Sequence, residues 1–324
     1  MTPDLPGALR AALDARLEGV SRRDLATRAA RVSAAYRGGG GSSGVVLGPD
    51  DALAYALARL PATYAADVAA FSAAAEACPD FAPRRLLDAG AGPGTAAWAA
   101  VAVWPGLEGA ELLDESPPFL ELAGLLAAQG PAVLAQAGRR RWNLTAADPL
   151  PPADLVSASY ALAEIAPEAQ GPLVLRLWAA CEGLLVLVEP GTPAGHGRIL
   201  AARETLIAEG AHIAGPCPHA LACPLAPPDW CHFVQRLPRS RDHRIAKGAE
   251  APFEDEKFIW LAAARPGVRV DAGAARILAP PVPAKPGLTL KLCAQDGGLE
   301  ARFVPRRDKP AYARARRLDW GDRL

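Results

Sequence analysis

The chain has 324 residues, of which 51% are hydrophobic and 22% charged, and its 35 basic and 35 acidic side chains give a formal net charge of zero. This composition is that of a globular protein with a sizeable core, so no disulfide scaffold is needed, and the balanced charge excludes steering of the whole molecule toward nucleic acid. No window is long and apolar enough to span a membrane, and no secretory signal opens the chain. We therefore expect a cytosol-like compartment in which the six cysteines are reduced.

The first 80 residues are predicted to be helical. LPGALRAALDARLEG and ALAYALARLPATYAADVAAFSAAAEA are rich in alanine and carry leucines and aromatic residues at three- and four-residue steps, which is the period of a helix with one buried face. The stretch RGGGGSSG between them is typical of a flexible loop or linker.

The sequence then alternates between strand-like and helix-like segments. RRLLDAGAGPG indicates a strand and a glycine turn, TAAWAAVAVWP a helix and GAELLDES a second strand, and the apolar strand GLLVLVEPG comes later in the same alternation. Buried apolar strands that alternate with helices predict a parallel, doubly wound sheet. After this core a Cys/His-rich segment, the strand EKFIWLAAAR and short strands separated by prolines follow.

We therefore divide the chain into four parts. They are an N-terminal helical region (1–80), a core (81–200), a Cys/His-rich segment with the last core strand (201–265) and a small C-terminal β element with a basic tail (266–324).

The glycine turn predicts a nucleoside-binding site. It reads acid-x-G-x-G-x-G, with Asp88 at the strand end followed by Gly90, Gly92 and Gly94. This is the pattern of Rossmann-like S-adenosylmethionine (SAM) methyltransferases, in which glycines let the backbone turn tightly and approach a ligand.

Two further acids are candidates for contact with the nucleoside. Asp114 ends the second strand, where a carboxylate can accept hydrogen bonds from both ribose hydroxyls. Asp148, after the third strand, is a candidate for the adenine amino group, and its alternative role is to cap a loop. The alternative for the whole turn is a degenerate fold whose pocket no longer binds.

No residue can be assigned to methyl transfer from the sequence. The fourth strand ends SASYALAEI and lacks the Asn/Asp-Pro-Pro-Tyr/Phe loop that holds a target nitrogen in amino-group methyltransferases, although Tyr160 is placed to stack on a base. Cys181 precedes the fifth strand on an apolar helix and is interpreted as a packing residue. The catalytic residues therefore stay unknown.

Three cysteines within fifteen residues predict a metal site, with the spacing Cys217-x5-Cys223-x7-Cys231. These gaps are wider than the C-x2-4-C pairs of zinc knuckles, and an iron–sulfur cubane takes four thiolates. Cys293 is the best candidate for the fourth ligand because a turn in a polar setting follows it. His219 and His232 adjoin cysteines as possible hydrogen-bond donors or as zinc ligands in a Cys3His site, and spacing alone leaves iron–sulfur and zinc open.

A basic stretch follows the third cysteine and predicts phosphate contacts. Its members are Arg236, Arg239, Arg241, Arg244 and Lys247. The alternative is a solvated arginine-rich face. The neighbouring FEDEK is expected to form local ion pairs around Arg244 or Lys247.

Residues 189–265 resemble the methyltransferase-like proteins of the mitochondrial small ribosomal subunit and their bacterial relatives. The motifs that carry the likeness are EPGTP, PCPH…CPL…DWCHF, R-S-x-x-H-R, P-F-E-D-E-K-F and the terminal ARRLDWGD. The likeness extends over roughly residues 80–324.

The resemblance implies a SAM-methyltransferase fold with a [4Fe–4S] cluster, and it carries the ligand role onto Cys217, Cys223, Cys231 and Cys293. It also implies association with small-subunit ribosomal RNA during ribosome assembly, with or without methyl transfer. We expect a monomer when off the ribosome, in a bacterial cytoplasm, or in the mitochondrial matrix if the source is an organelle. The alternative is a zinc-stabilised RNA or protein interaction module on a degenerate methyltransferase scaffold.

Overall fold

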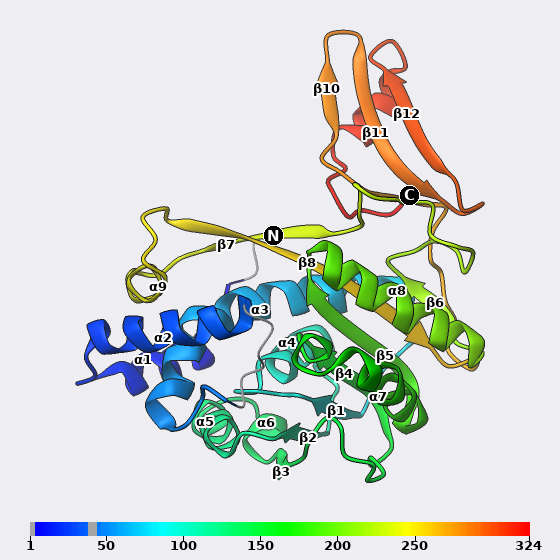
Figure 1. The fold of residues 1–324 in the computed structure, drawn as a ribbon. Coiled ribbons are helices and arrows are strands. Elements are labelled where there is room, and N and C mark those ends of the chain that lie inside the picture. The colour runs from blue at the N-terminus through cyan, green and yellow to red at the C-terminus, as the bar shows by residue number, and fades with distance from the viewer. Residues whose placement is uncertain (1–3, 38–43) are drawn as a thin grey trace.

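The computed structural model describes residues 4–37 and 44–324 (Figure 1). Three helices open the chain: α1 (Gly7–Leu17), α2 (Arg22–Arg37) and α3 (Pro49–Ala77). Leu9, Leu13 and Leu17 of α1 recur at four-residue steps and are all buried, as expected for one face of a helix. The predicted helical region is therefore confirmed, and the six central residues of the predicted glycine linker (38–43) lie outside the described residues.

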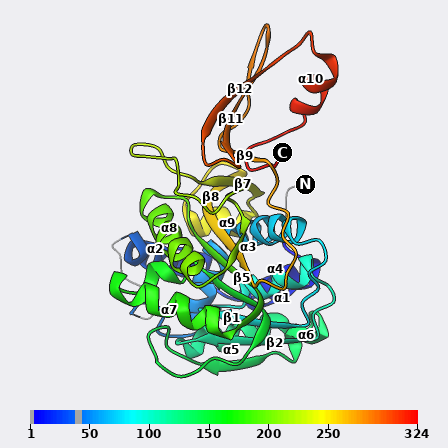
Figure 2. The ribbon, with the colours of Figure 1, turned by 90° about the vertical axis from the view of Figure 1, so that its right-hand side faces the viewer.

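The core is one large, mostly parallel sheet (Figures 1 and 2). Its strands are β1 (Arg85–Ala89), β2 (Gly109–Asp114), β3 (Gly138–Arg141), β4 (Ala153–Ser159), β5 (Cys181–Pro190), β6 (His212–Gly215), β7 (Phe233–Pro238) and β8 (Phe253–Ala264). They lie in the order β3-β2-β1-β4-β5-β8-β6, and β7 pairs with β8. The first five strands are parallel, whereas β8 is antiparallel to its neighbours. The predicted doubly wound sheet is confirmed.

Helices flank this sheet, as the strand–helix alternation predicts. They are α4 (Thr95–Val103), α5 (Pro117–Ala127), α6 (Ala132–Ala135), the short 3-10 turn η1 (Leu162–Glu164), α7 (Pro167–Ala180) and α8 (Pro193–Ala208). The helix α9 (Arg241–Lys247) lies apart from them, between β7 and β8, and contacts α2 and α3.

The C-terminal element is a second, four-stranded sheet that stands away from the main sheet (Figures 1 and 2). It contains β9 (Ala275–Ile277), β10 (Val282–Ala284), β11 (Gly287–Ala294), β12 (Leu299–Pro305) and the helix α10 (Lys309–Ala315). Leu288, Leu290 and Leu292 alternate along β11 and form a separate small core with Val304 and Ala315. In the described residues, no helix is long and apolar enough to cross a membrane.

Candidate metal centre and nucleoside pocket

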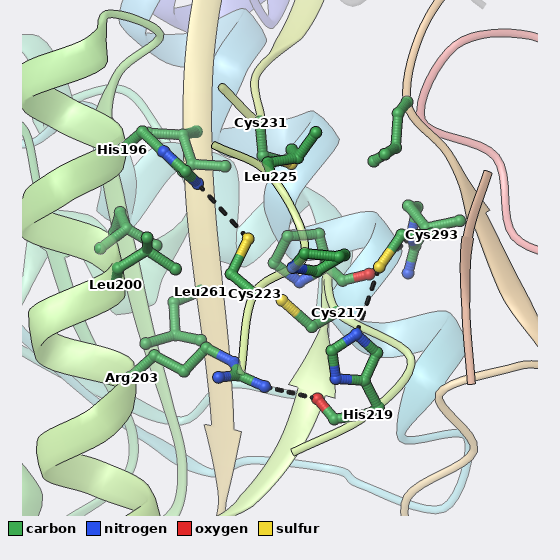
Figure 3. A pocket seen from close by; sticks show the side chains of 16 residues that line it. His196, Leu200, Arg203, Cys217, His219, Cys223, Leu225, Cys231, Leu261 and Cys293 are labelled. Atoms are coloured by element: carbon green, nitrogen blue, oxygen red, sulfur yellow. Dashed lines mark hydrogen bonds between the residues drawn. The ribbon is translucent and has the colours of Figure 1, made fainter. Parts of the chain in front are cut away.

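Four cysteines from two distant parts of the chain line one pocket (Figure 3). Cys217, Cys223 and Cys231 lie on the loop that joins β6 to β7, and Cys293 lies on β11 of the C-terminal element. The structure thus brings together the four residues that the sequence predicts as ligands. Their role as ligands stays a prediction.

Two histidines approach these sulfurs from opposite sides of the pocket (Figure 3). His219 Nε2 lies 3.3 Å from Cys293 Sγ, and His196 Nε2, on α8, lies 4.0 Å from Cys223 Sγ. Burial lowers the pKa of both imidazoles, so both are neutral at pH 7. The other predicted histidine, His232, stacks on Trp230 and meets Trp320 edge-on.

Two buried arginines hold the cysteine-bearing loop by its backbone. Arg203, which is 2% exposed, donates to the carbonyl oxygens of His219 and Leu221 at 2.7 and 2.8 Å. Arg276, which is 3% exposed, donates to the carbonyl of Pro216 at 2.9 Å. Both arginines line the pocket of the four cysteines.

These guanidinium groups lack counter-ions within the part of the chain that the structure describes. Neither Arg203 nor Arg276 forms an ion pair there, and Arg203 Nε and Arg276 Nη2 are buried without a hydrogen-bond partner. A buried cation without a counter-ion is costly, even where carbonyl groups accept its hydrogen bonds. A negatively charged group in this pocket would therefore be stabilised by both arginines.

Burial, together with the neighbouring thiols, raises the pKa of Cys231 well above its usual value and that of Cys293 to about 12. These two groups are therefore neutral thiols at pH 7, and a cation beside them would favour their thiolate forms. Four sulfur donors and two unpaired guanidinium groups fit a metal–sulfur cluster with a net negative charge.

Within residues 4–37 and 44–324, no group of three or more His, Cys, Asp or Glu side chains is placed to hold a metal ion. A tetrahedral zinc ion with Zn–S bonds of about 2.3 Å draws its thiolates close together. A cubane takes one thiolate on each of four irons and spaces the thiolates further apart.

The glycine turn joins β1 to α4 and needs glycine at three positions. Gly90, Gly92 and Gly94 have φ values of 72°, 53° and 82°, a region that side chains other than glycine rarely adopt. The backbone N–H of Gly90 donates to the carbonyl of Leu113 at 2.8 Å, which fixes the turn against the end of β2.

Asp114, at the end of β2, lies in contact with the glycine turn. Its two carboxylate oxygens accept hydrogen bonds from the backbone N–H groups of Gly92 and Ser116, each at 2.8 Å. Each oxygen keeps a further lone pair for a ligand hydroxyl. Burial raises the pKa of Asp114 to about 6.

The other two predicted acids behave differently from Asp114. Asp88 is 1% exposed, accepts a hydrogen bond from the Ser157 hydroxyl at 2.8 Å and leaves Oδ2 without a partner. Burial raises the pKa of Asp88 to about 7. Asp148 is exposed on the loop between β3 and β4.

Tyr160 forms a buried polar network rather than a free stacking surface. It follows β4 with a φ of 57°, and its hydroxyl donates to Glu256 Oε1 at 2.8 Å. Arg59 of α3 forms an ion pair with Glu256 at 3.0 Å and lies over the Tyr160 ring. Beside it, Ser159 donates to the fully buried Asp67. α3 therefore contributes directly to the region beyond the end of β4.

The predicted phosphate-binding stretch is largely paired within the chain. Arg236 forms a bidentate contact with Asp255, while Arg239 and Lys247 both contact Glu254. The remaining two, Arg241 and Arg244, form no ion pair within the described residues. The prediction that FEDEK forms ion pairs around Lys247 is borne out by these contacts, but the same contacts neutralise much of the stretch.

Sequence reasoning missed His196, Arg203 and Arg276. His196 and Arg203 are seven residues apart on α8, which is two helical turns, so both lie on the face that Ile199 also occupies. The seven-residue spacing of His and Arg in HGRILAAR could have predicted that both side chains lie on one face of the helix. Arg276, in the three-residue strand β9, carried no local signal because its role depends on how the C-terminal element docks.

The strand order, the glycine turn after β1 and the acid at the end of β2 define a Rossmann-like methyltransferase fold with N-terminal helices. Residues 49–324 match the family model described as mitochondrial small ribosomal subunit Rsm22. The chain belongs to this family.

Curated relatives in two eukaryotes are similar to the chain. The human mitochondrial ribosome assembly protein METTL17 is 30% identical over an alignment of 294 residues that covers 84% of this chain and 62% of METTL17. The Rsm22-cox11 tandem proteins 1 and 2 of Schizosaccharomyces pombe, both mitochondrial, are 28% identical over an alignment of 289 residues that covers 74% of this chain and 38% of theirs. The chain thus spans less than two thirds of the length of each.

Among solved structures, human N-acetylserotonin methyltransferase in complex with SAM matches with a TM-score of 0.41 and 14% identity, over 73% of this chain and 66% of that one. A putative RNA methyltransferase from Pyrococcus horikoshii matches with a TM-score of 0.38 and 10% identity, over 58% and 75% of the two chains.

Proposed function

We propose that the protein is a SAM-binding, [4Fe–4S]-containing, methyltransferase-like factor that binds small-subunit ribosomal RNA during ribosome assembly. The observation that carries the proposal is the pocket in which four cysteines meet two buried arginines without acidic partners. The family and the assembly role named for METTL17 support the ribosomal part of the proposal.

The cluster would be held by Cys217, Cys223, Cys231 and Cys293, with Arg203 and Arg276 as its nearby cations. It supplies a covalent link between the loop after β6 and the C-terminal element, which are separate in sequence. The protein's own contribution is to exclude water from the thiolates and to hold the loop through the arginine–carbonyl hydrogen bonds.

The glycine turn would hold SAM at the edge of the sheet. Asp114 would accept hydrogen bonds from the ribose, and Gly90, Gly92 and Gly94 would let the ligand approach the backbone closely. Asp88, which Ser157 holds at the end of β1, would be the second acid of this site. Asp148 stays the candidate for the adenine amino group. The proposal assigns no group to methyl transfer, because Tyr160 is held by Glu256 and Arg59.

The proposed cellular location follows from the small ribosomal subunit that the family name mentions. We propose action wherever small ribosomal subunits are assembled, which is the mitochondrion for the named relatives and the cytoplasm for a bacterial source. We further propose that the protein is a monomer when off the ribosome.

The test is anaerobic purification followed by iron, sulfide and zinc analysis of the wild type. About four irons and four sulfides per chain, with broad visible absorbance, are expected. Cys217→Ser should lose the iron, whereas Cys181→Ser, a buried cysteine outside the pocket, should keep it. A colourless protein with one zinc per chain would contradict the cluster.

The ribosomal part needs a separate measurement. The purified wild type is expected to bind small-subunit ribosomal RNA and to co-sediment with immature small subunits. SAM-dependent methyl incorporation into that RNA, lost in Asp114→Ala, would add an enzymatic role. Wild-type protein that binds neither the RNA nor the immature subunit would contradict the proposed function.

A further inference from the structure

The C-terminal element carries the positive charge of a chain that is neutral overall. Residues 285–317 hold nine Lys or Arg and three Asp or Glu side chains, a net charge of +6, while the whole chain has a formal net charge of zero. The rest of the chain is therefore net acidic. This asymmetry indicates that the element, rather than the whole molecule, is suited to an anionic partner.

Most of this charge is unpaired. Only two of the nine basic side chains form ion pairs within the described residues: Lys291 with Asp229, and Arg302 with Glu300. Seven exposed side chains form none: Lys285, Arg306, Arg307, Lys309, Arg314, Arg316 and Arg317. We call these seven residues the C-terminal basic surface. In contrast, three of the five residues in the stretch 236–247 are paired with acids of β8.

The seven side chains occupy adjoining parts of the element. The backbone N–H of Arg306 donates to the carbonyl of Pro286 at 2.9 Å, which places the turn of Lys285 beside Arg306. The Arg306 guanidinium lies 5.5 Å from the centre of the Tyr312 ring on α10. Basic side chains at the end of the sheet therefore lie next to α10.

The helix directs its arginines outward. Ala315 is buried and Ala311 and Tyr312 pack against the small core of the element, so the opposite side of α10 faces solvent. Arg314, Arg316 and Arg317 are all exposed at the end of the helix. Figure 2 shows α10 on the outer side of the C-terminal sheet.

We propose that the C-terminal basic surface binds the phosphodiester backbone of small-subunit ribosomal RNA. This inference rests on the proposed function. Five of its seven side chains are arginines, which bind phosphate through two parallel hydrogen bonds.

The composition of the surface favours RNA over a protein partner. A protein interface needs an apolar centre. The large apolar side chains that are exposed on the described part of this element, Val282, Leu299 and Phe303, lie on β10 and β12 and not on α10. The one acid within the surface, Asp308, accepts a hydrogen bond from the Ala311 N–H as the cap of α10.

The experiment uses the 324-residue chain purified anaerobically with its metal and transcribed small-subunit ribosomal RNA, with fluorescence anisotropy at several salt concentrations. The test variant combines Arg307→Ser, Arg314→Ser and Arg317→Ser. Each phosphate contact contributes a slope of about 0.7 to 0.9 to the dependence of log K on log salt. Removal of three contacts should lower the slope by about two and weaken binding at 0.1 M salt by roughly a hundredfold.

The matched control removes three exposed arginines that form no ion pair in the described chain and lie far from α10: Arg16, Arg23 and Arg141, each replaced by Ser. It should bind RNA with nearly the wild-type slope. Lysine at positions 307, 314 and 317 keeps the charge and should restore most of the affinity. Equal melting temperatures and iron contents show that every variant is folded.

The outcomes separate this inference from the proposed function. If the wild type does not bind the RNA, the proposed function is wrong and the inference falls with it. If the wild type binds and the Ser variant binds equally well, only the inference is wrong. It is also wrong if the Ser variant binds free RNA normally but no longer binds immature subunits, since the partner would then be a ribosomal protein.

Discussion

Replacement of Cys293 by Ser tests whether the C-terminal element is held by a cluster. Cys293 is the sole cysteine of β11, whereas the other three predicted ligands lie on one loop. Its replacement leaves a pocket with three thiols and should remove most of the bound iron and sulfide. The change should also release the C-terminal element, because the cross-link between the two segments is lost.

The size of this second effect follows from the chain. Cys231 and Cys293 are 62 positions apart, and a cross-link that closes a loop of this length disfavours opening by about 4 kcal/mol in the chain-entropy account. Without the cluster, the equilibrium for local opening of β11 should therefore rise by a factor of about a thousand. Amide hydrogen exchange of β11 and β12 measures this ratio directly.

The controls are the two buried cysteines outside the pocket. Cys78 and Cys181 are 1% and 2% exposed, so Cys78→Ser and Cys181→Ser report the cost of a buried hydroxyl without loss of a ligand. Both should keep their iron and the slow exchange of β11. If Cys293→Ser keeps the wild-type iron content, or exchanges in β11 no faster than the controls, the four-cysteine cluster is refuted.

Three further predictions follow from charge and hydrogen bonding. Arg276→Met removes a cation beside the proposed cluster and should lower the cluster's reduction potential by tens of millivolts. The estimate takes the interaction between the two charges as roughly 1–2 kcal/mol at an effective dielectric near 20. An unchanged potential in electrochemistry would contradict the counter-ion role. Asp114→Asn places an amide against the Gly92 or Ser116 N–H and should weaken SAM binding at least tenfold by calorimetry, and an unchanged Kd contradicts the predicted pocket. Burial raises the pKa of Asp88 from 3.8 to about 7, so the folded state favours its protonated form. The contribution of Asp88 to the free energy of unfolding is therefore full below about pH 4 and falls by roughly 4 kcal/mol as pH rises to 7. Asp88→Asn should flatten this part of the pH dependence in denaturant titrations.

The sequence was sufficient for features that depend on neighbours along the chain. The strand–helix alternation, the glycine turn and the burial of Cys181 all follow from local pattern. The placement of Cys181 on the helix was wrong, because α7 ends at Ala180 and Cys181 begins β5. Cys293 could be selected as a fourth ligand for a cubane because a turn in a polar setting follows it and the other two cysteines were predicted to lie in helical segments.

Features that depend on docking could not be predicted in this way. Arg276 reaches the carbonyl of Pro216 across 60 positions, and Arg59 meets Glu256 across 197. The basic stretch 236–247 illustrates the same limit. Its charge was visible in the sequence, but the antiparallel pairing of β7 with β8 sets Arg236 opposite Asp255 and brings acids to the stretch.

Because the pairing of β7 with β8 neutralises much of the basic stretch 236–247, the proposed cluster would instead orient the C-terminal basic surface. The loop and β11 also meet through the ion pair of Asp229 with Lys291, but both side chains are more than 40% exposed, and such pairs contribute little. The buried contacts between these two segments gather around the pocket, where His219 meets Cys293. A cluster there would connect the Rossmann-like core to the element that carries the C-terminal basic surface. Loss of iron should therefore weaken RNA binding through the orientation of α10, even though α10 contains none of the predicted ligands.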